Sequence, residues 1–188
     1  MDVVTAVRND YQVLDGLFAQ LATGQERPAL LAEIRARLLA HAKAAEKHVY
    51  PAAARSGDRA LARHHVNEHQ GALEALTAVE SAGPEDFSGR LSALVRAVRE
   101  QERQLENDVL PAIGAAVSSR KREDLGRAFE AQRLRELKRN GFDDALTKED
   151  LYIRAQKAGI PGRSSMSKSE LARALLAVKT GRTSSPGR

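Results

Sequence analysis

Hydrophobic residues recur at steps of three and four along most of the chain, which is the spacing of one face of an α-helix. Short segments rich in glycine, proline or serine separate these amphipathic stretches. The pattern predicts helices over residues 3–24, 29–53, 58–80 and 85 or 88 to 111. No segment alternates apolar and polar residues, so no strand is predicted. The sequence therefore predicts an all-α protein with an up-down-up-down four-helix bundle.

The pattern changes after residue 117. Ser118 or Ser119 is expected to cap a fifth helix that runs to residue 138, before Asn140 and Gly141 interrupt it. We divide the chain into a four-helix bundle (1–117), a basic connecting helix and linker (118–146), a small module (147–179) and a disordered tail (180–188).

Residues 147–179 predict a helix, an extended linker and a second helix. Thr147, with Asp150 in the first turn, is expected to cap the first helix, and Gly159 to end it. The linker over residues 160–166 contains proline and glycine and is predicted to be extended. Ser167 then begins the second helix in a capping-box pattern.

Composition limits the chemistry of the chain. It contains no cysteine, which excludes a disulfide framework, a thiolate metal site and a cysteine nucleophile. No apolar run approaches the ~18 residues of a membrane span, and the first residues do not resemble a signal peptide. We therefore expect a cytoplasmic protein without a membrane partner.

The positive charge is concentrated in the second half of the chain. Residues 1–119 carry a net charge of −3, residues 120–138 carry +3 and residues 139–188 carry +5. A basic region after a mildly acidic one is typical of proteins that bind a polyanion, and improved solubility is the alternative explanation.

All the histidines lie in the second and third predicted helices. Residues four or seven apart share a helix face, as His65 and His69 do, and as His41 and His48 do. Such a cluster can coordinate a transition metal through neutral imidazole nitrogens, or it can be a set of hydrogen-bonded core residues.

Residues 1–117 resemble the hemerythrin-like family, also called the HHE cation-binding family. The matching segments are Asn9-Asp10-Tyr11, His41 to Pro51, Glu68-His69 and Gln101 to Pro111. The spacing from His41 to Pro51 repeats from Gln101 to Pro111, as expected for the internal two-fold repeat of the family. The resemblance implies a four-helix bundle that holds two irons through histidines and carboxylates.

Four of the six ligand positions implied by this resemblance carry unsuitable side chains, namely Tyr11, Ala45, Gln101 and Leu105. Two irons bring several positive charges, which buried carboxylates must neutralise. We therefore expect no di-iron centre and no cofactor. The alternative is a reduced site that binds iron or another transition metal, with ligands drawn from His41, His65, His69, Tyr11 and His48.

Residues 147–179 are similar to small SAP-like and Rho-N-terminal-like modules, which often occur in proteins that handle nucleic acid. The similarity rests on Leu151-Tyr152, Gly159-Ile160, Gly162-Arg163-Ser164 and Met166-Ser167-Lys168. Turn amides and the positive end of the second helix are suited to phosphate. The residues expected to bind nucleic acid, DNA rather than RNA, are Lys148, Arg154, Lys157, Gly162, Arg163, Ser164, Ser165, Lys168 and Arg173. A protein-binding helical hairpin is the alternative.

No nucleophile–base pair, phosphate loop or carboxylate dyad is recognisable, so we predict no enzyme activity and assign no catalytic residue. The favoured interpretation is a nucleic-acid-associated binding protein whose bundle is a scaffold. A metal- or gas/redox-sensing protein with a reduced histidine site is the first alternative, and an oxygen-binding di-iron protein is the second. The surface of the bundle is also a candidate binding site for a protein partner or for a second copy of the chain.

Overall fold

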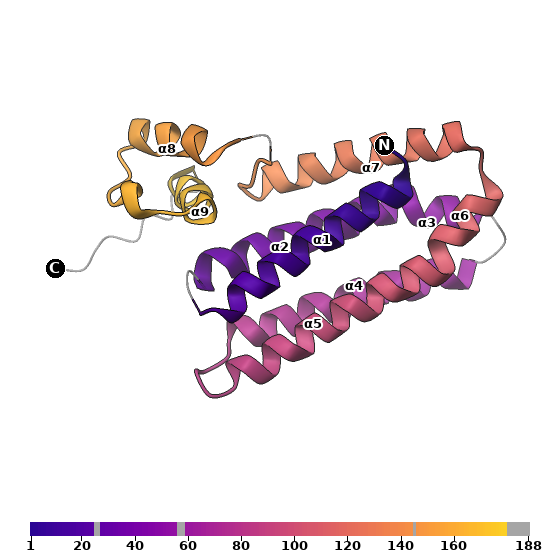
Figure 1. Ribbon diagram of the computed structural model, residues 1–188, viewed down its shortest axis with the longest axis horizontal. Coiled ribbons are helices and arrows are strands. Elements are labelled where there is room, and N and C mark those ends of the chain that lie inside the picture. The colour runs from indigo at the N-terminus through magenta and orange to yellow at the C-terminus, as the bar shows by residue number, and fades with distance from the viewer. Residues whose placement is uncertain (25–26, 56–58, 145, 180–188) are drawn as a thin grey trace.

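The computed structural model of the protein describes residues 1–24, 27–55, 59–144 and 146–179, except for the side chains of residues 59–68 and 179. Every regular element in these ranges is helical (Figure 1), which confirms the predicted all-α fold class. No described helix is long and apolar enough to span a membrane. The predicted disordered tail at 180–188 lies outside the described residues.

Four helical rods form the bundle. They are α1 (Val3–Ala22), α2 (Arg27–Ala44) continued by α3 (Tyr50–Ala54), α4 (Arg59–Glu80), and α5 (Phe87–Gln104) continued by α6 (Leu110–Ala116). Contacts join α1 to α2, α2 to α4, α4 to α5 and α5 to α1, which closes the square of an up-down-up-down bundle. Their inward faces form one apolar core.

The first rod shows how the sequence determines these helices. The Asp2 carboxylate caps α1 by accepting the backbone N–H of Val4 at 2.9 Å. Gly24 follows the end of α1 with a φ of +83°, a left-handed conformation that favours glycine. The apolar positions of the predicted stripe are all buried, and they are Val3, Val7, Tyr11, Leu14, Leu17, Phe18 and Leu21.

Two rods contain a π-helical turn that ends two residues before a proline. These turns are η1 (Ala45–Val49) and η2 (Leu105–Val109), and the amide after each turn bonds to the carbonyl five residues back. Pro51 and Pro111 then lie in the first turn of the helices that follow, where the missing N–H of proline costs little. The predicted end of the fourth helix at 111 is therefore wrong, because helical structure continues to Ala116.

A fifth helix, α7 (Ser119–Arg139), packs on the outside of α1 and α2 (Figure 1). The Ser118 hydroxyl accepts the backbone N–H of Lys121, so Ser118 rather than Ser119 is the cap. Gly126 lies against the start of the chain, and a Cβ at this position would clash with the backbone of residues 1–3. The close packing of α7 on α1 therefore depends on a glycine.

The C-terminal module consists of α8 (Lys148–Lys157), a 3₁₀ turn η3 (Arg163–Ser165) and α9 (Lys168–Lys179). The predicted capping box is present at Ser167, and the predicted cap at Thr147 is also a capping box, completed by Asp150. The linker is not extended throughout as predicted, because Gly162 adopts a φ of +69° and starts η3. The Ser165 hydroxyl donates to the Gly162 carbonyl at 3.0 Å and closes this turn.

The module packs on the bundle through α9, which contacts α2 (Figure 1). A second apolar cluster lies at the interface of the bundle and the module, which we call the seam. In this cluster, Ala36 and Ala40 of α2 lie next to Leu137, Phe142 and Leu171. The connecting helix, the bundle and the module therefore share buried surface.

Candidate functional site

Two histidines meet at the centre of the bundle. His41 of α2 and His69 of α4 are both buried, and their ring centroids lie 5.5 Å apart. The Tyr11 ring of α1 lies 4.8 Å from that of His41, and Phe129 of α7 covers His41 at 5.7 Å. The structure therefore brings together three residues of the predicted metal site, and a fifth helix closes the cluster from outside.

His41 is held by a buried carboxylate. Its Nδ1 lies 2.9 Å from Asp10, whose side chain is only 4% exposed. In the neutral ring, Nδ1 donates its proton to Asp10, so Nε2 keeps its lone pair. This Nε2 atom is buried and has no hydrogen-bond partner among the described residues. Metal-binding histidines usually donate the opposite ring N–H to a carboxylate, a backbone carbonyl or a water, and Asp10 is an acceptor of this kind.

His69 has a different environment, because hydrogen bonds occupy both of its ring nitrogens. Nδ1 lies 2.5 Å from the side-chain amide nitrogen of Gln101, and Nε2 lies 2.5 Å from the Tyr50 hydroxyl. The amide nitrogen donates to Nδ1, so the ring proton lies on Nε2 and is donated to Tyr50. His69 therefore has no lone pair available for a metal in this arrangement.

The positions that the family pattern gives to ligand carboxylates are apolar and buried. Ala45 begins η1 and Leu105 begins η2, and both are at most 1% exposed. The neighbouring acids point elsewhere, since Glu46 pairs with Lys43 at 3.2 Å and Glu106 pairs with an arginine of α1 at 2.7 Å. The side chains at the ligand positions of the family therefore do not fit a di-iron centre. In the described part of the chain, no group of three or more His, Cys, Asp or Glu side chains is placed to hold a metal ion.

His48 lies outside this cluster, contrary to the sequence prediction. It lines a surface groove with Lys121 and Leu125 of α7, and burial, with help from Lys47 and Arg135, lowers its pKa. The π turn between His41 and His48 adds a residue to the helical turn and changes their relative direction by about 100°. The side chain of the fifth predicted ligand, at position 65, lies outside the described part.

A chain of ion pairs begins at Asp10 and leads out of the core. Its second carboxylate oxygen lies 3.3 Å from Arg133 of α7. Arg133 also donates to Asp144 at 3.0 Å, and Asp144 accepts two further bonds from Arg37 of α2 at 2.7 and 3.2 Å. Burial opposes ionisation of Asp144, but Arg37 and Arg133 outweigh it and lower the pKa of this carboxyl.

The series of ion pairs that begins at Asp10 continues from Arg37 into the module. Arg37 pairs with Glu33 one turn earlier in α2 at 2.8 Å, and the Ser169 hydroxyl of α9 donates to the other Glu33 oxygen. Glu33, Arg37 and Ser169 are all at most 9% exposed. The sequence offered only the four-residue spacing of Glu33 and Arg37 as a signal for this network, because the other contacts join distant segments.

The predicted nucleic-acid residues fall into two groups. Arg163 of η3 is half-buried, donates to the Ile160 carbonyl at 3.1 Å and lies 5.8 Å from the Tyr152 ring centroid. It therefore has a structural contact within the module, whereas Gly162, Ser164 and Ser165 are exposed in the turn. Also exposed, and without ion pairs among the described residues, are Lys148, Arg154, Lys157, Lys168 and Arg173.

The cationic side chains of α7 form more ion pairs with carboxylates than those of the module do. The arginines of α7 that form ion pairs within the described ranges are Arg122, Arg127, Arg133 and Arg139. The charge of α7 is thus largely balanced by neighbouring carboxylates, whereas that of the module faces solvent.

Residues 3–113 match the family model described as Hemerythrin HHE cation binding domain. The matched segment extends from the start of α1 into α6 and ends before α7. No curated protein and no solved structure matches the chain significantly.

Proposed function

The chain belongs to the hemerythrin HHE cation-binding family, and from this premise we propose that its bundle is a non-enzymatic scaffold without a di-iron centre, carrying a C-terminal module that binds nucleic acid. The observation that carries the proposal is the contrast in charge pairing. Four arginines of α7 are engaged by carboxylates, namely Arg122, Arg127, Arg133 and Arg139. The lysines and arginines of α8 and α9 whose side chains are described are instead exposed, and none forms an ion pair with a described residue. Exposed cations of this kind can neutralise phosphates and release their counterions.

The chemistry of the bundle centre supports the scaffold part of the proposal. Ala45 and Leu105 cannot coordinate a cation. In His69, Nδ1 accepts a hydrogen bond from Gln101, and Nε2 carries the proton that is donated to Tyr50. Asp10 is the carboxylate beside His41, and Arg133 already balances its charge. A pair of iron ions would therefore lack the negative charge that it needs.

The nucleic-acid part is tested with the full chain and a fluorescent DNA duplex, by anisotropy at several salt concentrations. We compare a module variant, Arg154→Gln/Lys157→Gln, with a control variant, Arg90→Gln/Arg96→Gln. The control residues are exposed on α5, which lies across the bundle from the module (Figure 1). We expect the module variant to reduce the slope of log K against log salt by about two, and the control to leave it unchanged.

Binding that is absent at low salt, or that weakens equally in both variants, would show that the module does not bind nucleic acid. The same titration with an RNA duplex determines which nucleic acid is preferred, and the proposal expects tighter binding to DNA. Circular dichroism checks that both variants remain folded.

One observation favours a second candidate, a reduced metal site centred on His41. Its Nδ1 is held by Asp10 while the buried Nε2 has no partner in the described part of the chain, and this arrangement suits a single metal ligand. Metal analysis of the purified full chain and titration with Fe²⁺ or Zn²⁺ test this candidate. We expect His41→Gln to abolish any stoichiometric binding and His48→Gln to preserve it. Loss of binding in both variants, or in neither, would contradict a site at His41.

A further inference from the structure

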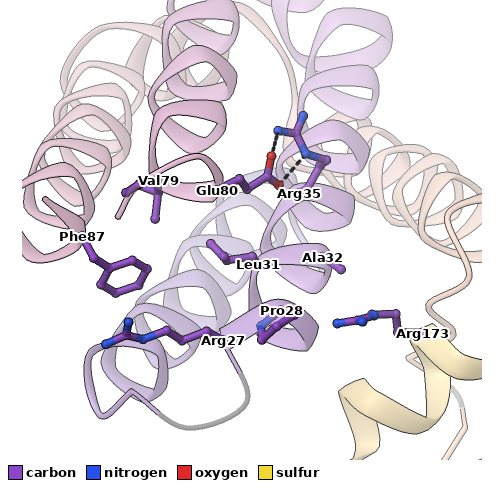
Figure 2. A pocket seen from close by; sticks show the side chains of 10 residues that line it. Arg27, Pro28, Leu31, Ala32, Arg35, Val79, Glu80, Phe87 and Arg173 are labelled. Carbon is purple, nitrogen blue, oxygen red and sulfur yellow. Dashed lines mark hydrogen bonds and ion pairs between the residues drawn. The ribbon is translucent and has the colours of Figure 1, made fainter. Parts of the chain in front are cut away.

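A groove of about 540 Å³ lies where the bundle meets the module (Figure 2). Its floor is apolar and includes Leu31 of α2, Val79 of α4 and Phe87 of α5. Arg173 extends from α9 toward the start of α2 and forms the opposite side (Figure 2). The volume is within the usual range for sites that bind small molecules, about 300–1,000 Å³.

Positive charge surrounds this floor. The Arg27 guanidinium stacks on the Phe87 ring at 3.9 Å, and its Nε is buried without a hydrogen-bond partner in the described structure. Arg35 is neutralised by Glu80 through two short bonds, but neither Arg27 nor Arg173 forms an ion pair with a described residue. The groove therefore presents two guanidinium groups, neither ion-paired within the described ranges, beside an apolar surface.

We propose that this groove binds a small amphiphilic anion, with an apolar chain and one carboxylate or similar acidic head group. The chain would cover Leu31, Val79 and Phe87, since removal of apolar surface from water is favourable. The head group would accept hydrogen bonds from Arg173, because a guanidinium fork matches the geometry of a carboxylate. Arg27 lies beside Phe87 at the other end of the floor and adds positive potential to the groove (Figure 2). The first turn of α2 contains no acidic residue, so its helix dipole also favours an anion here.

The location of the groove gives such a ligand a second effect. Arg173 belongs to α9, whereas the floor and Arg27 belong to the bundle. A ligand that contacts both sides would bridge the seam between the bundle and the module. Its binding should therefore increase the protection of α9 amides from hydrogen exchange.

The test uses the full chain and sodium decanoate below its micelle concentration, measured by isothermal titration calorimetry. Decanol and decyltrimethylammonium serve as neutral and cationic analogues with the same chain length. We expect decanoate to bind once per chain, decanol to bind about tenfold more weakly and the cation not to bind. In amide ¹H–¹⁵N spectra, decanoate should shift Leu31, Val79 and Phe87.

Two variants place negative charge in the groove. Arg173→Glu reverses an exposed cation, and Pro28→Glu introduces a carboxylate at an exposed lining position in the first turn of α2, where an acid favours the helix. We expect each to weaken decanoate binding by about tenfold or more. Arg96→Glu is the matched control, because this exposed arginine on α5 does not line the groove.

Several results would overturn the proposal. They are an absence of decanoate binding, equal binding of the cationic analogue, an equal loss of affinity in the Arg96→Glu control, and amide shifts that map away from the groove. Binding to vesicles of anionic phospholipid without binding to monomeric decanoate would also contradict it, because it would indicate a membrane surface site. Circular dichroism confirms that the charge variants retain their helix content.

Discussion

Asp144 connects α2, α7 and the module, and its replacement by asparagine is the most direct test of the ion-pair chain. The carboxylate accepts two bonds from Arg37 and one from Arg133. Asparagine has almost the same shape but no charge, so Asp144→Asn removes the electrostatic part of these contacts while preserving the packing.

The loss of stability in Asp144→Asn can be estimated from the ion pairs that Arg37 and Arg133 keep in this variant. Arg37 keeps its ion pair with Glu33, and Arg133 keeps Asp10 and Glu130, so neither arginine becomes an isolated buried charge. The cost is therefore below the 3–5 kcal/mol typical of breaking a buried pair. Bonds to charged groups contribute about 1.5–3 kcal/mol each, and Asp144 is partly exposed, so we expect a loss of about 2–3 kcal/mol in the free energy of unfolding.

Urea denaturation followed by circular dichroism measures this loss, and the corresponding fall in Tm is roughly 4–12 °C. Hydrogen exchange should show a larger loss of protection in α9 than in α4, because Asp144 adjoins the seam. Asp15→Asn is the control, since Asp15 pairs with Arg99 at 3.3 Å on the exposed surface and should contribute at most about 1 kcal/mol. If Asp144→Asn costs no more than the control, the ion-pair chain does not stabilise the docked module.

Three further predictions concern pH and glycine. Arg37 and Arg133 outweigh burial and lower the pKa of Asp144 from its ordinary value of 3.8, so the group stabilises the fold above that value and this contribution is lost as the pH falls through the lower folded-state pKa. The stability difference between the native chain and Asp144→Asn should therefore shrink from pH 7 to pH 3 in urea titrations, and a constant difference would contradict the assignment. Gly126→Ala should destabilise the protein by about 1–3 kcal/mol, because its Cβ would clash with the backbone of the first residues. Gly71→Ala in α4, where nothing lies within 4 Å of the added Cβ, should instead stabilise it by about 0.5–1 kcal/mol, and equal effects in thermal melts would refute the packing argument.

Local sequence signals predicted the limits of many helices correctly. Ser118, Thr147 and Ser167 cap the helices that they precede, and Gly159 adopts the left-handed conformation expected after α8. These features depend on residues a few positions apart, so the sequence contains the information needed to predict them.

The errors arose where structure depends on distant contacts or on a change of helical period. The direction of His48 was mispredicted because a uniform α-helix was assumed through η1. The roles of Arg133 and Asp144 were missed because their partners lie on other elements, and no spacing rule relates Asp10 to residue 133. His41 and His69, both named for the reduced metal site, lie side by side in the structure, but their hydrogen-bond partners were not identified from the sequence.

The contact between Glu33 and Ser169 closes a loop of 136 residues and therefore bears on the order in which the chain folds. A contact over such a distance has a high entropic cost until the intervening helices are in place. Glu33 and Arg37 can pair as soon as α2 forms, because they are one helical turn apart. During synthesis, the bundle thus acquires a ready-made docking point for α9 long before α9 leaves the ribosome. The seam should be the last part of the molecule to form and the first to open.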